Sequence, residues 1–129
     1  MQADAITQRF MQPRFAGVLA LGAGQQTYQA IVGTQQQGSV LHLSIAVDAV
    51  TQTVADARFK MYGCGSCIAV ADLLCEQLIG LGLKQVQSFN TQDLATTLAL
   101  PMVKMHCTWL AAEALEKMTT DWQTASSID

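Results

Sequence analysis

Three cysteines and one histidine form two tight clusters in this chain. The first cluster is the segment Gly63–Cys67, which reads GCGSC, and the second is the adjacent pair His106 and Cys107. Thiolates and imidazoles are the ligands that zinc, iron and related metals prefer in proteins. Thiolates also attack sulfur. The pattern therefore predicts a site that holds a metal, accepts sulfur, or does both, with four candidate ligands: Cys64, Cys67, His106 and Cys107.

Cys64 is the strongest single candidate. It lies between Gly63 and Gly65, directly after a predicted strand and directly before a predicted helix. The partial positive charge of a helix start favours the ionised form of a thiol. Flanking glycines allow the backbone to approach an ion or a substrate closely, which a buried structural cysteine would not need. These features favour a functional role for Cys64 over a structural one.

The other cysteines are more ambiguous. Cys67 lies one turn beyond Cys64, which suits a second ligand, but it also falls on the apolar stripe of the same predicted helix. Because cysteine packs well as a small hydrophobe, the stripe slightly favours a core role for Cys67. Cys75 lies well inside that stripe and is predicted to be core. The pairing of His106 with Cys107 favours a metal site over a purely structural histidine.

Length and composition limit the class of protein. The chain has 129 residues, half of them apolar and 13% charged, which predicts one globular domain. The net charge of −3, without a basic cluster, argues against nucleic acid as a partner. No apolar run approaches the ~20 residues of a membrane span. Residues 1–13 lack the features of a signal peptide, so we expect a cytoplasmic protein with reduced thiols.

The periodicity of apolar residues predicts the elements that position these side chains. Strict alternation predicts strands at Val40–Asp48 and Val54–Tyr62, and a third at Thr27–Gly33, joined as an antiparallel meander. Helical periodicity then predicts helices at Ala3–Gln12, Ser66–Gly80, Thr91–Leu98 and Cys107–Trp122, with a frayed polar tail at Gln123–Asp129. The predicted fold class is α+β, a three-stranded antiparallel sheet covered by helices, in a single domain over residues 1–129.

Three segments resemble one known family, the IscU/NifU-type iron–sulfur cluster assembly scaffolds. They are Asp56–Ser66 (DARFKMYGCGS), Leu100–Lys104 (LPMVK) and the pair His106 and Cys107. The resemblance extends from Phe10 to Trp122 and is closer to the Isc branch than to the SufU branch. It implies the same α+β fold, a small antiparallel sheet covered by helices.

The resemblance also implies a function. Such scaffolds receive persulfide sulfur from a cysteine desulfurase, combine it with iron into a [2Fe–2S] cluster, and pass the cluster to recipient apo-proteins; they are not enzymes. Three cysteines with an Asp or a His hold the cluster, and Cys64, Cys107 and His106 match the second cysteine, the third cysteine and the histidine. An Hsp70-type chaperone and its J-protein co-chaperone recognise an LPPVK segment, which matches Leu100, Pro101, Met102, Val103 and Lys104. Because Pro101 disfavours a helix at Leu100, we expect this segment to be exposed and extended.

The chain departs from this family at one turn. The family carries its first cysteine in a Gly-Ala-Pro-x-Cys-Gly-Asp turn, but the equivalent stretch here places Gln37 at the cysteine and Ser39 at the aspartate. Two interpretations follow. Either Cys67 replaces the missing cysteine in a working scaffold, or the chain is a degenerate paralogue that binds Zn²⁺ or the assembly partners as an adaptor or regulator. A stand-alone zinc-binding structural domain is weaker, because Leu100–Lys104 would have no purpose. We favour the scaffold.

Overall fold

The fold is built on a three-stranded antiparallel sheet. The computed structural model describes residues 5–20 and 22–126. The strands are β1 (Gln25–Thr34), β2 (Ser39–Asp48) and β3 (Val54–Tyr62), in the order β1-β2-β3. The antiparallel meander expected from the sequence is confirmed, with β1 and β2 slightly longer than predicted. None of the helices in the described part of the chain combines the length and the apolar character needed to cross a lipid bilayer.

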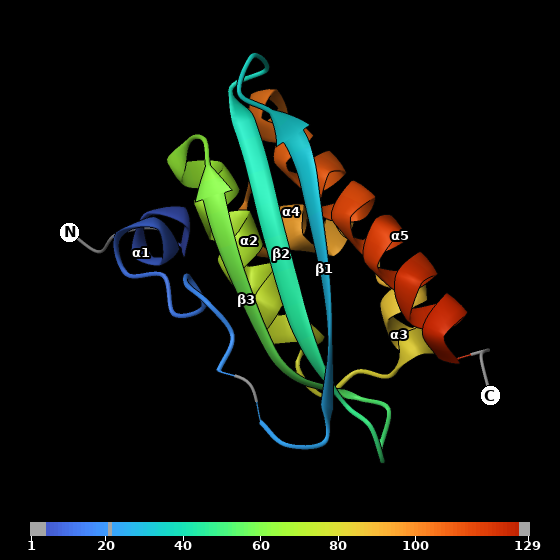
Figure 1. The fold of residues 1–129 in the computed structure, drawn as a ribbon. Coiled ribbons are helices and arrows are strands. Elements are labelled where there is room, and N and C mark those ends of the chain that lie inside the picture. The colour runs from blue at the N-terminus through green and yellow to red at the C-terminus, as the bar shows by residue number, and fades with distance from the viewer. Residues whose placement is uncertain (1–4, 21, 127–129) are drawn as a thin grey trace.

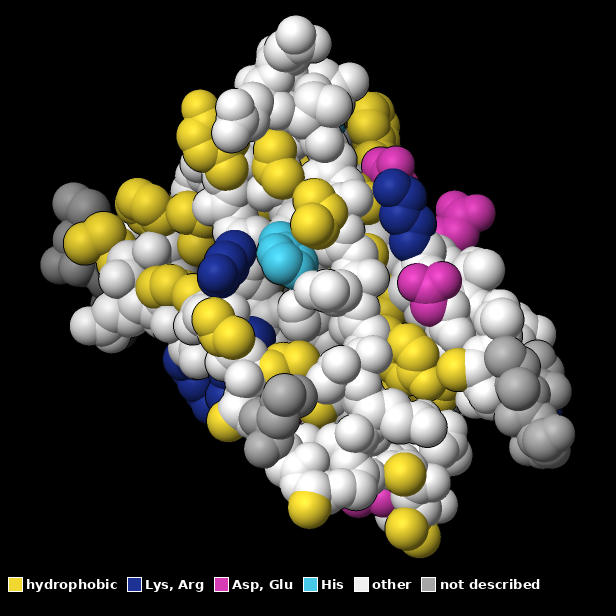
Figure 2. Space-filling view, in the orientation of Figure 1, with side chains coloured by type: hydrophobic (Ala, Val, Ile, Leu, Met, Phe, Trp, Pro, Cys, Tyr) yellow, Lys and Arg dark blue, Asp and Glu magenta, His cyan; other side chains and the backbone are white. Residues whose placement is uncertain are grey.

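The helices gather mainly on one face of this sheet (Figure 1). Helix α2 packs against β3 and helix α5 against β1, and the two helices also contact each other. The bounds are α1 Ala5–Met11, α2 Gly65–Leu78, α3 Leu83–Gln87, α4 Gln92–Leu98, the 3₁₀ turn η1 Met102–Lys104, and α5 His106–Ser126. The α+β class is confirmed. The opposite face, shown in Figure 2, carries a mixture of uncharged polar and scattered apolar side chains with few charges.

The core lies between the sheet and helices α2 and α5. The alternating residues of β2 are at most 2% exposed, and so are the stripe residues of the two helices: Leu41, Leu43, Ile45, Val47, Val70, Ala71, Leu74, Leu78, Ala111, Ala114 and Met118. Cys75 is fully buried among them, as predicted. Burial raises the pKa of the Cys75 thiol far above its ordinary value, so this thiol stays protonated.

The structure differs from the sequence predictions at three places. Strict alternation along Val54–Tyr62 predicts that Ala55 shares the buried face of Ala57 and Phe59, but a β-bulge between Ala46 and Val47 shifts the register and leaves Ala55 exposed. Helix α3 was not expected, because five residues between loops show too little periodicity. Helix α5 continues to Ser126 beyond the predicted end at Trp122, so Gln123–Ser126 is not frayed. Residues 3, 4 and 127–129 of the predicted elements lie outside the described residues.

Asp72 connects the N-terminal segment to helix α2 through hydrogen bonds and an ion pair. Its carboxylate, 1% exposed, accepts a hydrogen bond from Arg9 Nη1 at 2.9 Å and from the backbone N–H groups of Arg14 and Phe15 at 2.7 and 2.9 Å. Arg9 and Arg14 also pair with Glu76, which is more exposed. The backbone of Phe15 and Gly17 then pairs with Phe59, which covers the outer edge of β3.

Replacing Asp72 by Ala should therefore destabilise the fold. Because the change leaves two backbone N–H groups and a guanidinium without their acceptor, we expect the free energy of unfolding to fall by roughly 2–4 kcal/mol. Urea denaturation followed by circular dichroism measures this. Glu76→Ala is the matched control, since it removes only partly exposed ion pairs that are worth ~1 kcal/mol or less. Equal losses in the two variants would contradict the anchoring role of Asp72.

Candidate metal centre

The junction between β3 and α2 positions the first ligand cluster. Cys64 is the N-cap residue of α2, and its carbonyl accepts hydrogen bonds from the N–H groups of Cys67 and Ile68 at 3.1 and 3.2 Å. A side chain at Gly63 would approach Met61 Cε to 3.1 Å and Ser39 Oγ to 3.3 Å. Gly63 also has a backbone φ of +157°, which L side chains rarely adopt, so glycine is favoured where the strand turns into the helix beside the β1–β2 turn. The Cys64 side chain is half-buried.

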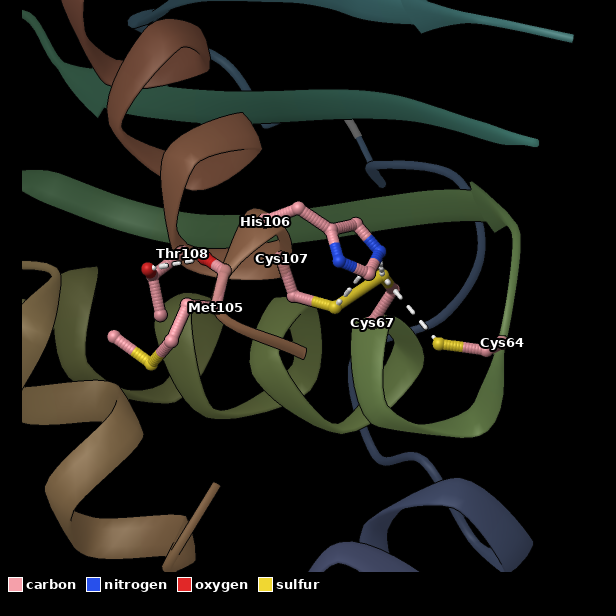
Figure 3. The surroundings of a disulfide bond; sticks show 6 residues. All are labelled: Cys64, Cys67, Met105, His106, Cys107 and Thr108. Atoms are coloured by element: carbon pink, nitrogen blue, oxygen red, sulfur yellow. Dashed lines mark hydrogen bonds between the residues drawn. A yellow bond between two sulfur atoms is a disulfide. The ribbon is translucent and has the colours of Figure 1, made fainter. Parts of the chain in front are cut away.

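The start of α5 positions the second cluster. Met105 ends the preceding turn, and its carbonyl accepts a hydrogen bond from Thr108 Oγ1 at 2.7 Å (Figure 3). The helix then begins at His106. Packing of α5 against α2 buries Cys107, which is 2% exposed, while the His106 side chain remains half-buried. As Figure 3 shows, the imidazole lies directly beside the sulfur atoms of Cys67 and Cys107.

The four predicted ligands come together at this place. One ligand atom from each of Cys64, Cys67, His106 and Cys107 lies within 4.8 Å of the others. The Sγ atoms of Cys64 and Cys67 are 3.7 Å apart, and His106 Nε2 lies 3.6 Å from the sulfur of Cys67 and 3.7 Å from that of Cys107. The separation between Cys64 and Cys67 suits two ligands of one tetrahedral ion, because two thiolates bound ~2.3 Å from one ion lie ~3.8 Å apart. The sulfurs of Cys67 and Cys107 lie too close together for this, because they are bonded to each other.

Cys67 and Cys107 form a disulfide in this structure. The expectation that all four cysteines are reduced thiols is therefore not met. The physical reason is that the packing of α2 on α5 brings the two Cα atoms to 5.0 Å, within the range that a disulfide requires. Sequence spacing could not reveal this contact between two helices. Binding through all three thiolates requires this disulfide to be reduced, whereas Cys64 is already free.

Cys67 combines the two roles that the sequence left open. Cys67 is 2% exposed and belongs to the apolar cluster between the sheet and the helices. Its sulfur nevertheless lies within contact distance of Cys64 and His106. A position at the boundary between the core and the ligand cluster explains why helical periodicity assigned Cys67 to the stripe.

The β1–β2 turn, where the chain departs from the family pattern, lies at the rim of this cluster. Gln37 and Ser39 line a cavity of about 310 Å³ together with His106 and residues of the first turns of α5. Gln37 is exposed and Ser39 is 7% exposed. The two substituted positions therefore face the same cavity as a candidate ligand.

Sequence reasoning missed Trp109, which lines this cavity and is 64% exposed. Its only signal in the sequence is that a large aromatic residue falls outside the buried stripe of its helix. Glu113 lines the same cavity one turn further along α5. An exposed aromatic ring beside a ligand cluster is a feature typical of protein contact surfaces.

The segment Leu100–Lys104 does not join the cluster but immediately precedes it. Met102 and Val103 are 87% and 80% exposed, which agrees with the expected exposure. The expected extended conformation is wrong for Met102–Lys104, which forms a 3₁₀ turn closed by a hydrogen bond from Lys104 N–H to Pro101 O at 2.9 Å. The chain has to turn here because α5 begins two residues after Lys104. Pro101 itself keeps an extended backbone.

Comparison with known proteins identifies the family of this chain. The family described as NifU-like N terminal domain matches residues 1–128. The chain is 39% identical over 121 residues to the iron–sulfur cluster assembly scaffold protein IscU of Escherichia coli (strain K12), which covers 94% of this chain and 93% of that protein. It is 31% identical to the mitochondrial iron sulfur cluster assembly protein 1 of Debaryomyces hansenii, over 97% of this chain and 69% of that protein.

Two further similarities complete the comparison. Iron–sulfur cluster assembly protein 1 of Arabidopsis thaliana is 38% identical over 93 residues, and the match spans only 56% of that longer protein. The crystal structure of a putative scaffold protein for the SUF system from Fervidobacterium islandicum has the same fold, with a TM-score of 0.61, 15% identity and coverage of 92% of this chain and 96% of that one. From its ligand cluster, its fold and these relatives, the chain belongs to the NifU-like N-terminal domain family of IscU-type iron–sulfur cluster assembly scaffolds.

Proposed function

We propose that this protein is an iron–sulfur cluster assembly scaffold, which accepts iron and sulfur, assembles a [2Fe–2S] cluster as transient cargo and passes it to recipient apo-proteins. The observation that carries the proposal is the convergence of three cysteine sulfurs and one imidazole nitrogen within 4.8 Å. Relatives that match nearly the whole chain are named as iron–sulfur cluster assembly scaffold proteins, which supports the same role.

In the reduced protein, Cys64, Cys67, His106 and Cys107 would supply the ligands. Three thiolates and one imidazole suit a [2Fe–2S] cluster, whose two irons need four protein ligands in total. Cys67 takes the place of the cysteine that the family carries at the position of Gln37. The support for this role is that the Cys67 sulfur lies 3.7 Å from Cys64 and 3.6 Å from His106.

Zn²⁺ is a second candidate occupant of the same ligands. The sulfur–sulfur separation of 3.7 Å and the sulfur–nitrogen separations of 3.6 and 3.7 Å fit one tetrahedral ion. A single ion and a cluster cannot share four ligands. Zinc would therefore compete with cluster assembly.

The experiment that tests the proposed function is anaerobic reconstitution after reduction of the disulfide. Reduced protein is incubated with ferric iron and sulfide, which supply the oxidation states of the oxidised [2Fe–2S] cluster, and the product is then mixed with an apo-ferredoxin. We expect a visible charge-transfer spectrum on the scaffold that moves to the ferredoxin as its own spectrum appears. A reduced protein that binds iron without developing a sulfide-dependent spectrum would contradict a scaffold role.

The proposed partners are a cysteine desulfurase that delivers persulfide sulfur, and an Hsp70-type chaperone with its J-protein co-chaperone. Support for the chaperone comes from the exposed side chains of Met102 and Val103, which follow Pro101 directly before the ligand cluster. Two large apolar side chains that are more than three-quarters exposed are available for docking in a narrow groove.

A peptide spanning Leu100–Lys104 should bind the cognate Hsp70, and a peptide with Met102→Pro should bind more tightly. A second proline removes conformations that the free peptide otherwise loses on binding, so we expect a gain of about three- to tenfold in affinity. Fluorescence anisotropy measures both dissociation constants. A peptide with Val103→Asp is the control for apolar docking. No binding by either of the first two peptides would contradict the chaperone proposal.

A further inference from the structure

The disulfide between Cys67 and Cys107 is shielded from solvent by the two helices that carry it. Both residues are only 2% exposed. A reductant in solution therefore has poor access to either sulfur. Binding of a metal through all three thiolates requires reduction of this disulfide. Reduction of a buried disulfide in turn requires a route by which a reductant can react with it.

Cys64 is a thiol through which a reductant can react with the disulfide. It is a free cysteine, it is half-buried, and its Sγ lies 3.7 Å from the Sγ of Cys67. Figure 3 shows it at the start of α2, beyond the Cys67 end of the disulfide. The other free thiol among the described residues, Cys75, is fully buried and has a raised pKa. Cys64 is thus the thiol that contacts the disulfide.

The surroundings of these sulfurs suit thiol–disulfide exchange. Cys64 and Cys67 have the C-x-x-C spacing that is typical of disulfide oxidoreductases, with Cys64 at the N-cap of α2. His106 Nε2 lies 3.7 Å from the sulfur of Cys107, so it can donate a hydrogen bond to this sulfur when it leaves as a thiolate.

We propose that Cys64, Cys67 and Cys107 form a thiol–disulfide relay that switches the ligand cluster between a closed, oxidised form and an open, metal-binding form. The Cys64 side chain first rotates to bring its sulfur in line with the Cys67–Cys107 bond, because the attacking and leaving sulfurs must lie on opposite sides of the central one. The thiolate of Cys64 then attacks the Cys67 sulfur, the bond between Cys67 and Cys107 breaks, and Cys107 leaves as a thiolate. This exchange forms one disulfide and breaks one, so it needs no external electrons.

A dithiol reductant completes the opening. One of its thiolates attacks the accessible sulfur of Cys64, which forms a mixed disulfide and releases Cys67 as a thiolate. The second thiol of the reductant then attacks the mixed disulfide, frees Cys64 and leaves as the oxidised, cyclic disulfide. Two electrons have passed from the dithiol to the protein. In the reverse direction, a two-electron thiol oxidant, such as a small-molecule disulfide, closes the relay.

The relay would also control loading of the [2Fe–2S] cluster, and this consequence rests on the proposed function. In the closed form, Cys67 and Cys107 are unavailable as thiolates and only Cys64 and His106 remain as ligands, which is too few for tight binding of Zn²⁺ or a cluster. Oxidation would then stop loading, and reduction by a dithiol would restart it. Exchange among the three cysteines does not itself depend on the scaffold role.

The test measures how fast dithiothreitol opens the disulfide in metal-free, diamide-oxidised protein. Samples are quenched with acid and alkylated, and mass spectrometry counts the free thiols. We expect Cys64→Ser to slow the opening by about tenfold or more, because the direct path to a buried disulfide remains as the only route. Cys75→Ser is the matched control and should react like the wild type. Equal rates for wild type and Cys64→Ser would overturn the relay.

A second variant keeps the proposal testable if Cys64→Ser folds poorly. Oxidised Cys107→Ser should contain a disulfide between Cys64 and Cys67, identified by peptide mapping. Two free thiols at these positions after oxidation would overturn the proposal. Failure of the relay is distinguishable from failure of the scaffold role. If the relay is wrong, the opening rates of wild type and Cys64→Ser are equal, but the fully reduced protein still assembles a cluster. If the scaffold role is wrong, the reduced protein assembles no cluster, but the two opening rates still differ.

Discussion

Cys64→Ser should remove tight Zn²⁺ binding from the reduced protein. The Cys64 sulfur lies 3.7 Å from that of Cys67 at the start of α2, and a serine hydroxyl does not replace a thiolate as a zinc ligand. Because loss of even an outer-sphere partner typically weakens a metal site roughly 10–100-fold, loss of a ligand should weaken it by about a hundredfold or more. Competition with a chromogenic chelator, in the presence of a phosphine reductant, measures the affinity.

The matched control for this change is Cys75→Ser. It also removes one thiol from α2, but Cys75 is buried in the core and its pKa is raised, so it is not available as a thiolate. Zinc affinity should be unchanged in this variant, although its stability should fall. Stoichiometric, tight zinc retained by Cys64→Ser would show that the ligand assignment is wrong.

Restoring the two residues that the family carries at the β1–β2 turn should lengthen the lifetime of the cluster. Gln37 and Ser39 line the same cavity as His106, and Gln37 is exposed in the turn, so Gln37→Cys with Ser39→Asp should be tolerated. A cysteine and a carboxylate are far better iron ligands than an amide and a hydroxyl, and we expect the half-life of the reconstituted cluster to rise by about tenfold or more. The decay of visible absorption in air measures this half-life.

Gln36→Cys with Ser39→Asp is the control for this gain. Gln36 belongs to the same exposed turn but does not line the cavity, so its thiol should add nothing to the ligand set. A wild-type cluster that lives as long as that of the double variant would mean that Gln37 and Ser39 do not limit the lifetime of the cluster. A double variant that forms no cluster would instead favour the adaptor or regulator without a cluster.

The sequence predicted the strands better than the helix ends. The alternation of Leu41, Leu43, Ile45 and Val47 is a direct consequence of one buried sheet face, and the structure confirms it. The last turn of α5 is different, because it depends on a tertiary contact. Gln87 of α3 donates a hydrogen bond to Gln123 at 3.0 Å. Since α3 itself was not predicted, neither its contact nor the longer helix could be.

For the candidate site, residue types and spacing predicted which side chains would matter but not how they would meet. Cys64, His106 and Cys107 stood out because of glycine neighbours and pairing. The position of Cys67 was ambiguous, since its contacts with Cys107 and His106 join two helices that are distant in the sequence. Residues such as Trp109, which is exposed beside a cavity, carry almost no sequence signal.

Comparison of Cys67→Ala with wild type in anaerobic reconstitution tests the central claim most directly, namely that Cys67 is the ligand that compensates for Gln37. Both proteins are fully reduced, loaded with iron and sulfide, and read by visible absorption with iron and sulfide analysis. We expect a [2Fe–2S] spectrum with about two irons per chain in the wild type. In Cys67→Ala it should be lost, with the fold intact by circular dichroism. A Cys67→Ala protein with the full spectrum and iron content of the wild type would contradict the claim and assign Cys67 to the core.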